Sequence, residues 1–239
     1  MLNKNFMFNS IMRALSRVFV IFLFSLFIAF MGLAFHTNVS TDLTLEDETV
    51  FTGIGLKKPT TSLTFKAELV EIERFQKEVI KRAPMGDGIP YYEAREPADL
   101  MREGQGLCYD RSRAFDKAAT FLGFEARHVY LLFKQDKSFL SAIFTPKHPS
   151  HAVTEVMTSK GWMLIDSNTP WMAVTRTGEP LNADDVWKRF DELENPPPYL
   201  KEPWWAIRGM YSRGGHFYRP YIRFPELNWY DFSVSFVRG

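Results

Sequence analysis

The first long pattern in the chain is an uncharged apolar run near its N-terminus. The eighteen residues from Val18 to Phe35 carry no charge, and Ala14 and Leu15 add apolar length before them. A helix needs about twenty mainly apolar residues to cross the hydrocarbon core of a bilayer. The pattern therefore predicts a single transmembrane helix at residues 14–35.

The charges that flank this run predict its orientation. The basic residues before it are Lys4, Arg13 and Arg17, and the acidic residues after it are Asp42, Glu46, Asp47 and Glu48. Because positive flanks stay in the cytoplasm, residues 1–13 are expected there, with the rest of the chain at the periplasmic face of a bacterial inner membrane. The alternative is a signal peptide cleaved near Gly32-Leu33-Ala34, which would leave a secreted protein. The length and bulk of the run favour an uncleaved signal anchor.

Helical spacing returns beyond a polar stretch at residues 36–60, which is expected to be a tether. Residues 62–83 place apolar side chains near helical spacing and predict an amphipathic helix. A short helix is expected at Pro97–Arg102. A further helix is expected from Cys108 to about Leu122, ending at Gly123. The seven-residue spacing of Cys108, Phe115 and Leu122 puts the thiol on the stripe that faces the interior.

Residues 151–158 and 161–168 read as the two strands of a hairpin around Ser159-Lys160-Gly161. If the loop is Ser159-Lys160, or the four residues 158–161, His151 lies opposite Asn168 and Val153 opposite Asp166. His151 and Asp166 then share a face as diagonal neighbours about 7–8 Å apart. A slip of one residue would place them on opposite faces.

Composition limits what the chain can do. About 200 residues follow the apolar run, enough for one domain with a sizeable core. The net charge of +1 gives no indication of nucleic-acid binding. One cysteine and five scattered histidines make no convincing metal site, and no phosphate-binding glycine loop is present, so no cofactor is expected. A single cysteine forms no internal disulfide, and such a leftover thiol in an exported protein is a candidate for reactivity.

Cys108, His151 and Asp166 together suggest nucleophilic catalysis. A helix N-terminus lowers a thiol pKa, and an imidazole held in one tautomer by a carboxylate withdraws the proton. Taken singly, each has an ordinary explanation: Cys108 as a small apolar residue, His151 as a polar residue at a strand start, and Asp166 as a turn residue. Their joint placement favours catalysis. Gln105 is a candidate donor to an oxyanion, and the backbone N–H of Cys108 is the alternative.

Four separated segments then resemble the transglutaminase-like superfamily. They are Gly106–Asp110, Leu122–Val129, His151–Val156 and Gly161–Asp166, and the resemblance covers about residues 60–175. It implies an α+β fold over residues 61–195, with a papain-like core in which the nucleophile helix packs on an antiparallel sheet. It also implies that Cys108 is the nucleophile, His151 the general base and Asp166 its orienter. Val153 stands where the family usually has tryptophan.

The C-terminal part, residues 196–239, is rich in aromatic residues and begins with Pro196-Pro197-Pro198. We expect it to pack on the core as an extension. The alternative is a platform that stacks on a glycan or peptide, or that rests at the membrane interface. Trp162 and Trp171 are candidate substrate-binding residues, and Trp171 and Trp187 are candidates to line the same aromatic surface near the cleft. His148 and His216 are substitutes for His151 as the base, and Glu155 is an expected ion-pair partner for an arginine such as Arg127.

The resemblance implies attack by Cys108 on an amide or peptide carbonyl through a thioester. Resolution by water would make the protein a peptidase or amidase, and resolution by an amine would make it a crosslinking enzyme. Hydrolysis is favoured because a small single domain is poorly suited to exclude water. Two other classes stay open, a non-catalytic binding module that keeps the fold and a membrane scaffold. The expected substrate is a peptide, a protein or another amide.

Overall fold

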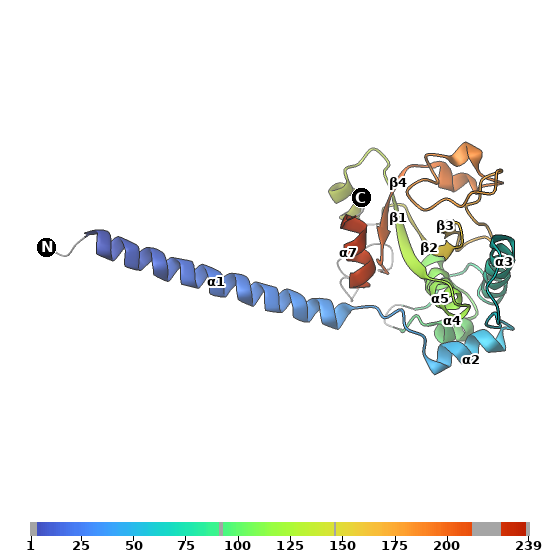
Figure 1. The fold of residues 1–239 in the computed structure, drawn as a ribbon, viewed down its shortest axis with the longest axis horizontal. Helices are drawn as coiled ribbons and strands as arrows, with labels where there is room; N and C mark the ends of the chain where they lie inside the picture. Colours follow the sequence, from blue (N-terminus) through green and yellow to red (C-terminus); the bar gives the residue numbers. More distant parts are fainter. Residues whose placement is uncertain (1–3, 91–92, 146, 212–225, 238–239) are drawn as a thin grey trace. The chain divides into compact units, whose positions relative to one another are not determined.

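The computed structural model describes residues 4–90, 93–145, 147–211 and 226–237 (Figure 1). The chain divides into two compact units, residues 1–38 and residues 39–239.

The first unit is a single helix, α1, from Lys4 to Thr37. Its segment Met12–Ala34 spans 23 residues and is long and apolar enough to cross a membrane. At 1.5 Å per residue that segment is about 35 Å long. An apolar N-terminal helix of membrane-spanning length is thus confirmed, and its orientation in a membrane stays a prediction.

The second unit is built on a four-stranded antiparallel sheet with the order β3-β2-β1-β4. The strands are β1 (Ala126–Phe133), β2 (Ser150–Thr158), β3 (Gly161–Ile165) and β4 (Trp204–Arg208). The helices are α2 (Leu45–Gly53), α3 (Phe65–Arg82), α4 (Pro97–Glu103), α5 (Cys108–Phe121), α6 (Phe139–Ile143) and α7 (Trp229–Val237). Two short 3₁₀ helices are η1 (Phe190–Glu192) and η2 (Pro198–Lys201). This is the mixed helix and antiparallel-sheet architecture that the sequence predicts.

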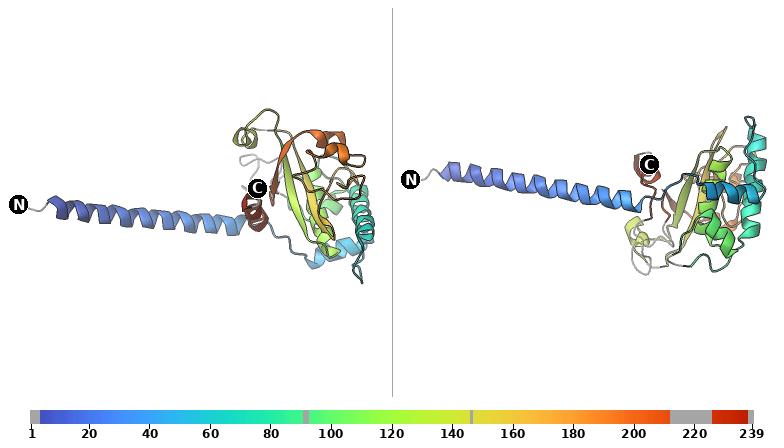
Figure 2. Two further views of the ribbon diagram at one scale, coloured as in Figure 1. Left: turned by 45° about the horizontal axis from the view of Figure 1, so that its top comes forward. Right: turned by 90° about the horizontal axis from the view of Figure 1, so that it is seen from below.

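Helix α5 packs on strands β1 and β2, and α3 packs on α5, so that two helical layers cover one face of the sheet (Figure 2). The apolar stripe of each helix drives this stacking, because burying it removes hydrocarbon from water. The rings of Phe75 in α3 and Phe115 in α5 meet edge-on with centroids 5.6 Å apart, and both side chains are fully buried. The predicted helices at residues 62–83, Pro97–Arg102 and Cys108–Leu122 are confirmed to within a few residues.

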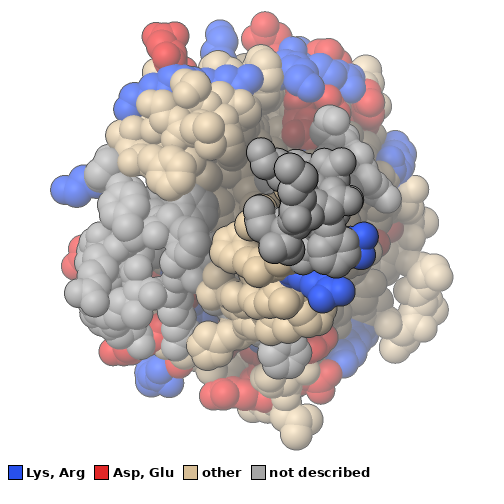
Figure 3. All heavy atoms as spheres, turned by 90° about the vertical axis from the view of Figure 1, so that its left-hand side faces the viewer, with Lys and Arg blue, Asp and Glu red and all other residues tan. Residues whose placement is uncertain are grey.

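The other face of the sheet is covered by the segment that follows β3. A second apolar cluster lies there, with Val153 and Leu164 from the sheet and Leu181 and Leu193 from the covering segment. On the face drawn in Figure 3, Lys and Arg side chains are interspersed with Asp and Glu rather than gathered by sign. That distribution agrees with a net charge near zero.

Residues 36–60 are not a simple tether, and this expectation is corrected. Thr44 begins α2 with a reciprocal capping box to Asp47, and the helix buries Phe51 completely. Ile54 and Leu56 are also buried in the core that α3 and α5 share. A helix of nine residues is too short for its apolar spacing to stand out among polar neighbours.

The C-terminal extension also differs in part from the expectation of a segment that packs on a finished core. Strand β4 pairs with β1 and is itself one of the four strands of the sheet. Trp204 is buried and meets Phe133 edge-on at 6.1 Å. Residues 212–225, which include His216, lie outside the described residues.

Candidate active site

Cys108 is the first residue of α5, at the end of a tightly fixed turn. The buried carboxylate of Asp110 accepts hydrogen bonds from the backbone N–H groups of Leu107, at 3.0 Å, and Ile89, at 3.3 Å. Burial raises the pKa of Asp110, and these N–H groups oppose the shift. Asp110 therefore holds the chain that leads into the helix, and the thiol lies half-buried at the positive end of the helix dipole.

His151 and Asp166 are brought together by the hairpin of β2 and β3. Thr158 pairs with Gly161 and Thr154 pairs with Ile165, so the loop is Ser159-Lys160. This is the predicted register. The Nε2 atom of His151 lies 2.6 Å from Oδ1 of Asp166, and both side chains are buried. Since Nε2 bonds the carboxylate, Nδ1 is the ring nitrogen left for the thiol.

The thiol and the imidazole form a coupled pair. Burial alone would raise the pKa of Cys108, but the hydrogen bond and charge of His151, the backbone N–H of Ala152 and the charge of Arg111 together lower it. Burial lowers the pKa of His151, yet the hydrogen bond that His151 donates to Asp166 and the contact with Cys108 raise it to about 9. The two shifts have opposite signs and favour a thiolate beside an imidazolium at neutral pH.

Four contacts saturate the Asp166 carboxylate. Besides His151 at Oδ1, its Oδ2 atom accepts from the backbone N–H and the hydroxyl of Thr169, both at 2.8 Å, and from the hydroxyl of Tyr199 at 2.5 Å. Burial raises the pKa of Asp166, but the bonds from His151, Tyr199 and Thr169 outweigh it and lower the pKa. The carboxylate is held ionised and in one orientation, as an orienter of the imidazole requires.

Tyr199 is a site residue that the sequence analysis missed. It lies in η2, directly after the proline run, and its ring meets the His151 ring edge-on at 5.4 Å. Burial and the charge of Asp166 raise its pKa, so the phenol stays a donor. A tyrosine after three prolines is a weak signal, because only the fold shows which side chain it meets.

Two further buried polar residues support the site and were also missed. Arg111, one turn after Cys108, donates to Oδ1 of Asn168 at 2.6 Å and is 1% exposed. Burial lowers the pKa of Arg111, and the charges of Cys108 and Asp166 oppose that shift. Gln76 of α3 donates to the backbone carbonyl of Asp166 at 2.9 Å. One residue adds positive charge beside the thiol, and the other fixes the backbone that carries the carboxylate.

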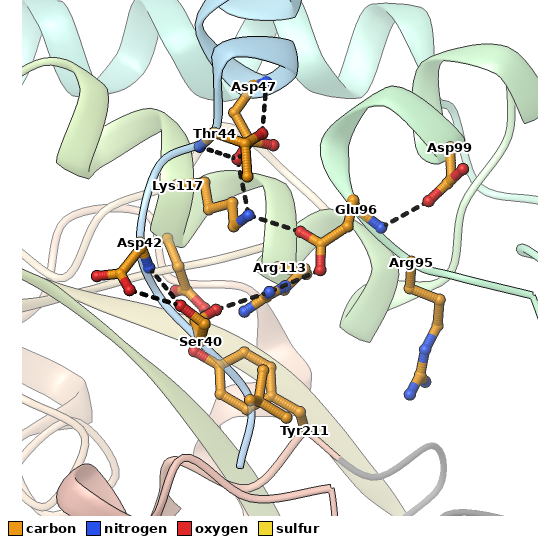
Figure 4. A network of polar contacts seen from close by, with 12 residues as sticks. Ser40, Asp42, Thr44, Asp47, Arg95, Glu96, Asp99, Arg113, Lys117 and Tyr211 are labelled. Carbon is orange, nitrogen blue, oxygen red and sulfur yellow. Dashed lines mark hydrogen bonds and ion pairs between the residues drawn. The ribbon is translucent and has the colours of Figure 1, made fainter. Parts of the chain in front are cut away.

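The far side of α5 is held by a buried network of charges (Figure 4). Lys117 donates to Asp47 and to Glu96, each at 2.7 Å, and Lys117 and Asp47 are almost fully buried. Arg113 donates to Glu96 and to the backbone carbonyl of Ser40, each at 2.8 Å. The helix that carries Cys108 is thereby joined to α2, to α4 and to the start of the second unit.

The other candidates lie elsewhere or keep only a predicted role. The Gln105 amide nitrogen donates to Glu103 at 3.2 Å, and its oxygen accepts from the backbone N–H of Asp87. The Trp171 backbone carbonyl accepts from the N–H of Asp166 at 2.9 Å, so this tryptophan adjoins the site. The guanidinium carbon of Arg127 lies over the Trp162 ring, 3.8 Å from its centroid, and Trp162 lines a separate groove. The Nε2 atom of His148 lies 2.6 Å from the carbonyl oxygen of Phe133.

The expected ion pair of Glu155 is confirmed. Arg127 Nε lies 2.6 Å from Glu155 Oε2, and Arg208 of β4 contacts both carboxylate oxygens at 3.0 Å. Glu155 therefore joins β1, β2 and β4 on the face of the sheet away from α5. Among the described residues no group of three or more His, Cys, Asp or Glu side chains could hold a metal ion.

These features define a mixed α/β domain with a cysteine, a histidine and an aspartate in contact where a helix begins on an antiparallel sheet. Residues 58–167 match the family model described as "Transglutaminase-like superfamily", so this part of the chain is a transglutaminase-like domain. Members are generally enzymes with a papain-like thiol fold. The matched interval contains Cys108, His151 and Asp166. Comparison with curated proteins gave no match.

Proposed function

We propose that this protein is a thiol enzyme that cleaves amide or peptide bonds through a thioester on Cys108. The observation that carries the proposal is the contact of Cys108 with His151, whose pKa is raised to about 9 while that of the thiol is lowered. A thiolate beside an imidazolium is a nucleophile with its proton donor already in place. In this proposal Asp166 orients the imidazole, and Tyr199 and Thr169 hold Asp166.

The reaction would begin with attack of the Cys108 sulfur on the carbonyl carbon. The new C–S bond places negative charge on the carbonyl oxygen. The backbone N–H of Cys108 is the proposed donor to that oxygen, because the first N–H groups of a helix have no intrahelical partner. The imidazolium of His151 then protonates the leaving nitrogen, the C–N bond breaks, and a thioester remains.

Water would resolve the thioester. The now neutral His151 takes a proton from water, the resulting hydroxide attacks the carbonyl carbon, and the C–S bond breaks to return the thiolate. An amine would use the same steps and give acyl transfer instead. Hydrolysis is the proposed outcome, because Tyr199, in contact with Asp166, is still 37% exposed and water can approach that side of the site.

The test uses the full-length chain in nanodiscs with casein as substrate, in the presence and absence of the primary amine dansylcadaverine. We expect new peptide ends in both samples and little dansyl label on casein, with neither product from Cys108→Ser. Dansyl labelling that outpaces cleavage would replace hydrolysis by acyl transfer. An intact Cys108 that reacts with iodoacetamide no faster than free cysteine would remove the enzyme proposal and favour a binding module.

We also propose that α1 anchors the enzyme in the membrane with residues 39–239 outside the cytoplasm. The support is the apolar length of Met12–Ala34 and the three basic residues that precede Val18. A reporter fused after Gly239 should be active only outside the cytoplasm, and the protein should resist carbonate extraction. A soluble form that starts at Phe35 would show that the segment is cleaved.

A further inference from the structure

A groove of about 740 Å³ lies on the second unit, apart from the thiol site. Thr154 reaches Asp116 of α5 at 2.7 Å, so its neighbour Glu155 and the partner Arg127 point to the opposite face of the sheet. The groove extends from that face, near Trp187, across the β4 edge to helix α7, and residues 204–208 of β4 line it from both sides of the sheet. None of Cys108, His151 and Asp166 lines it. Its volume falls within the range of ligand sites, about 300–1,000 Å³.

Tryptophan is the dominant lining residue of this groove. Trp162, Trp187 and Trp205 are each half-buried, with part of the indole open to solvent, and Trp204 forms part of the floor. The Nζ atom of Lys134 lies over two of these rings, 5.1 Å from the Trp187 centroid and 5.5 Å from the Trp205 centroid. The two indoles therefore flank one ammonium group.

Lys134 differs in its pairing from the arginines of the same groove. Arg127 and Arg208 are both bound by the buried carboxylate of Glu155, and Arg208 also pairs with Asp184 at 2.7 Å. Lys134 has no carboxylate within ion-pair distance in the described part of the chain. The groove thus presents one uncompensated positive charge between aromatic faces. A ligand that matches it carries an anionic group next to flat apolar surfaces.

We propose that this groove binds an oligosaccharide that carries carboxylate groups. The C–H faces of two sugar rings would stack on Trp187 and Trp205, and a sugar carboxylate would pair with Lys134. The exposed carboxylate of Asp184 at the rim can accept hydrogen bonds from sugar hydroxyl groups. Such a site would hold an acidic polysaccharide or its conjugate on the protein, independently of the chemistry at Cys108.

The β3 edge of the sheet is closed to an added peptide strand, and the β4 edge is capped at Arg208. An extended peptide gains affinity by adding a strand to an open edge. At the β4 edge, the backbone N–H of Arg208 donates to the hydroxyl of Ser235, at 3.2 Å. Ser235 belongs to α7, which lies beside β4 in Figure 1. At the β3 edge, Leu164 exchanges backbone hydrogen bonds with Leu181 and Ala173, at 2.9 and 2.8 Å. The glycan proposal therefore rests on side-chain recognition by the indole faces and the one ammonium, and tetraglutamate tests the peptide alternative.

The test is isothermal titration of the full-length chain in phosphatidylcholine nanodiscs. The probes are tetragalacturonate, the neutral cellotetraose and tetraglutamate. We expect saturable binding of tetragalacturonate and at least about tenfold weaker binding of tetraglutamate. Lys134→Met should weaken tetragalacturonate binding about tenfold and leave cellotetraose binding within about twofold, because only the charge is removed. Trp187→Ala should abolish binding of both sugars.

Lys201→Met is the matched control, because Lys201 lies over the Phe190 ring outside the groove; it should change nothing. Trp187→Phe keeps an aromatic ring and should keep part of the affinity for the sugars. That result would show that Trp187→Ala loses binding through the missing ring and not through loss of the fold. Absence of saturable tetragalacturonate binding would overturn the proposal. Equal affinity for tetraglutamate, lost in Lys134→Met, would also overturn it in favour of an acidic peptide. Since the readout is binding, a negative result for thiol activity leaves this test unaffected.

Discussion

The pairing of Cys108 with His151 predicts fast alkylation of the thiol at acid pH, which His151→Ala should abolish. An ordinary thiol with a pKa of about 8.5 is only about 0.3% thiolate at pH 6. Each unit by which a thiol pKa falls raises the thiolate fraction about tenfold and lowers its intrinsic reactivity about threefold. The rate at pH 6 therefore rises about threefold per unit of lowering while the pKa stays above that pH.

His151→Ala removes both the hydrogen bond and the charge that lower the pKa of Cys108, whereas the burial that raises it remains. The variant thiol should then be less ionised than free cysteine. We expect wild type to react with iodoacetamide at pH 6 at least about tenfold faster than His151→Ala. The wild-type rate should stay level through neutral pH. It should change again only as His151 loses its proton near its pKa of about 9.

The assay is intact-mass detection of the adduct over time, with melting temperature as a check on folding. His148→Ala is the control, because this buried histidine contacts the carbonyl oxygen of Phe133 instead of the thiol. It should label at the wild-type rate. Equal rates for wild type and His151→Ala, both folded, would refute the ion pair and leave Cys108 as a half-buried thiol with no catalytic role.

Three further substitutions test the surroundings of the site. Asp166→Asn should keep the fold yet lower turnover. The equivalent change in a serine-protease triad costs about ten-thousandfold, and a thiol enzyme should lose less because its nucleophile is stronger. Unchanged turnover in a folded variant would exclude the triad. Tyr199→Phe removes a bond that lowers the pKa of Asp166, so the acid limb of the pH–kcat/KM profile should move to higher pH, and an unmoved limb would limit Tyr199 to packing. Lys117→Met leaves Asp47 buried without its cation, and breaking such a pair costs about 3–5 kcal/mol. For a domain of about 200 residues, this loss lowers Tm by roughly 6–20 °C. The control Lys77→Met breaks an exposed pair with Glu73 and should cost under about 1 kcal/mol. Equal losses of stability in the two variants would contradict the buried network.

The helix of Cys108 and the β2–β3 register were predictable because local rules determine both. Helical spacing and Gly123 bound α5, and a two-residue loop leaves one register in which Val153 and Leu164 both face the core. That register puts His151 and Asp166 on one face and close together. The candidate catalytic contacts were therefore within reach of the sequence.

The parts that escaped prediction depend on partners far along the chain. Helix α2 is stabilised by the ion pair of Asp47 with Lys117. Its few apolar side chains are buried only because α5 packs against it. Strand β4 reads Trp-Trp-Ala-Ile-Arg, which shows no alternation of polar and apolar residues. Tyr199 and Gln76 bind Asp166 from segments on either side of it. Polar residues give no periodic signal, so such contacts emerge only from the tertiary structure.

The position of Tyr199 has a consequence for where this domain ends. The interval that matches the superfamily stops at residue 167, just after Asp166, so a fragment cut there would contain all three candidate catalytic residues. It would lack the tyrosine that completes the Asp166 contacts and the strand that flanks β1. A truncated protein of that kind could be inert while every motif residue is intact. Conversely, substitution at position 199 offers a route to tune or silence the site without changing the motif.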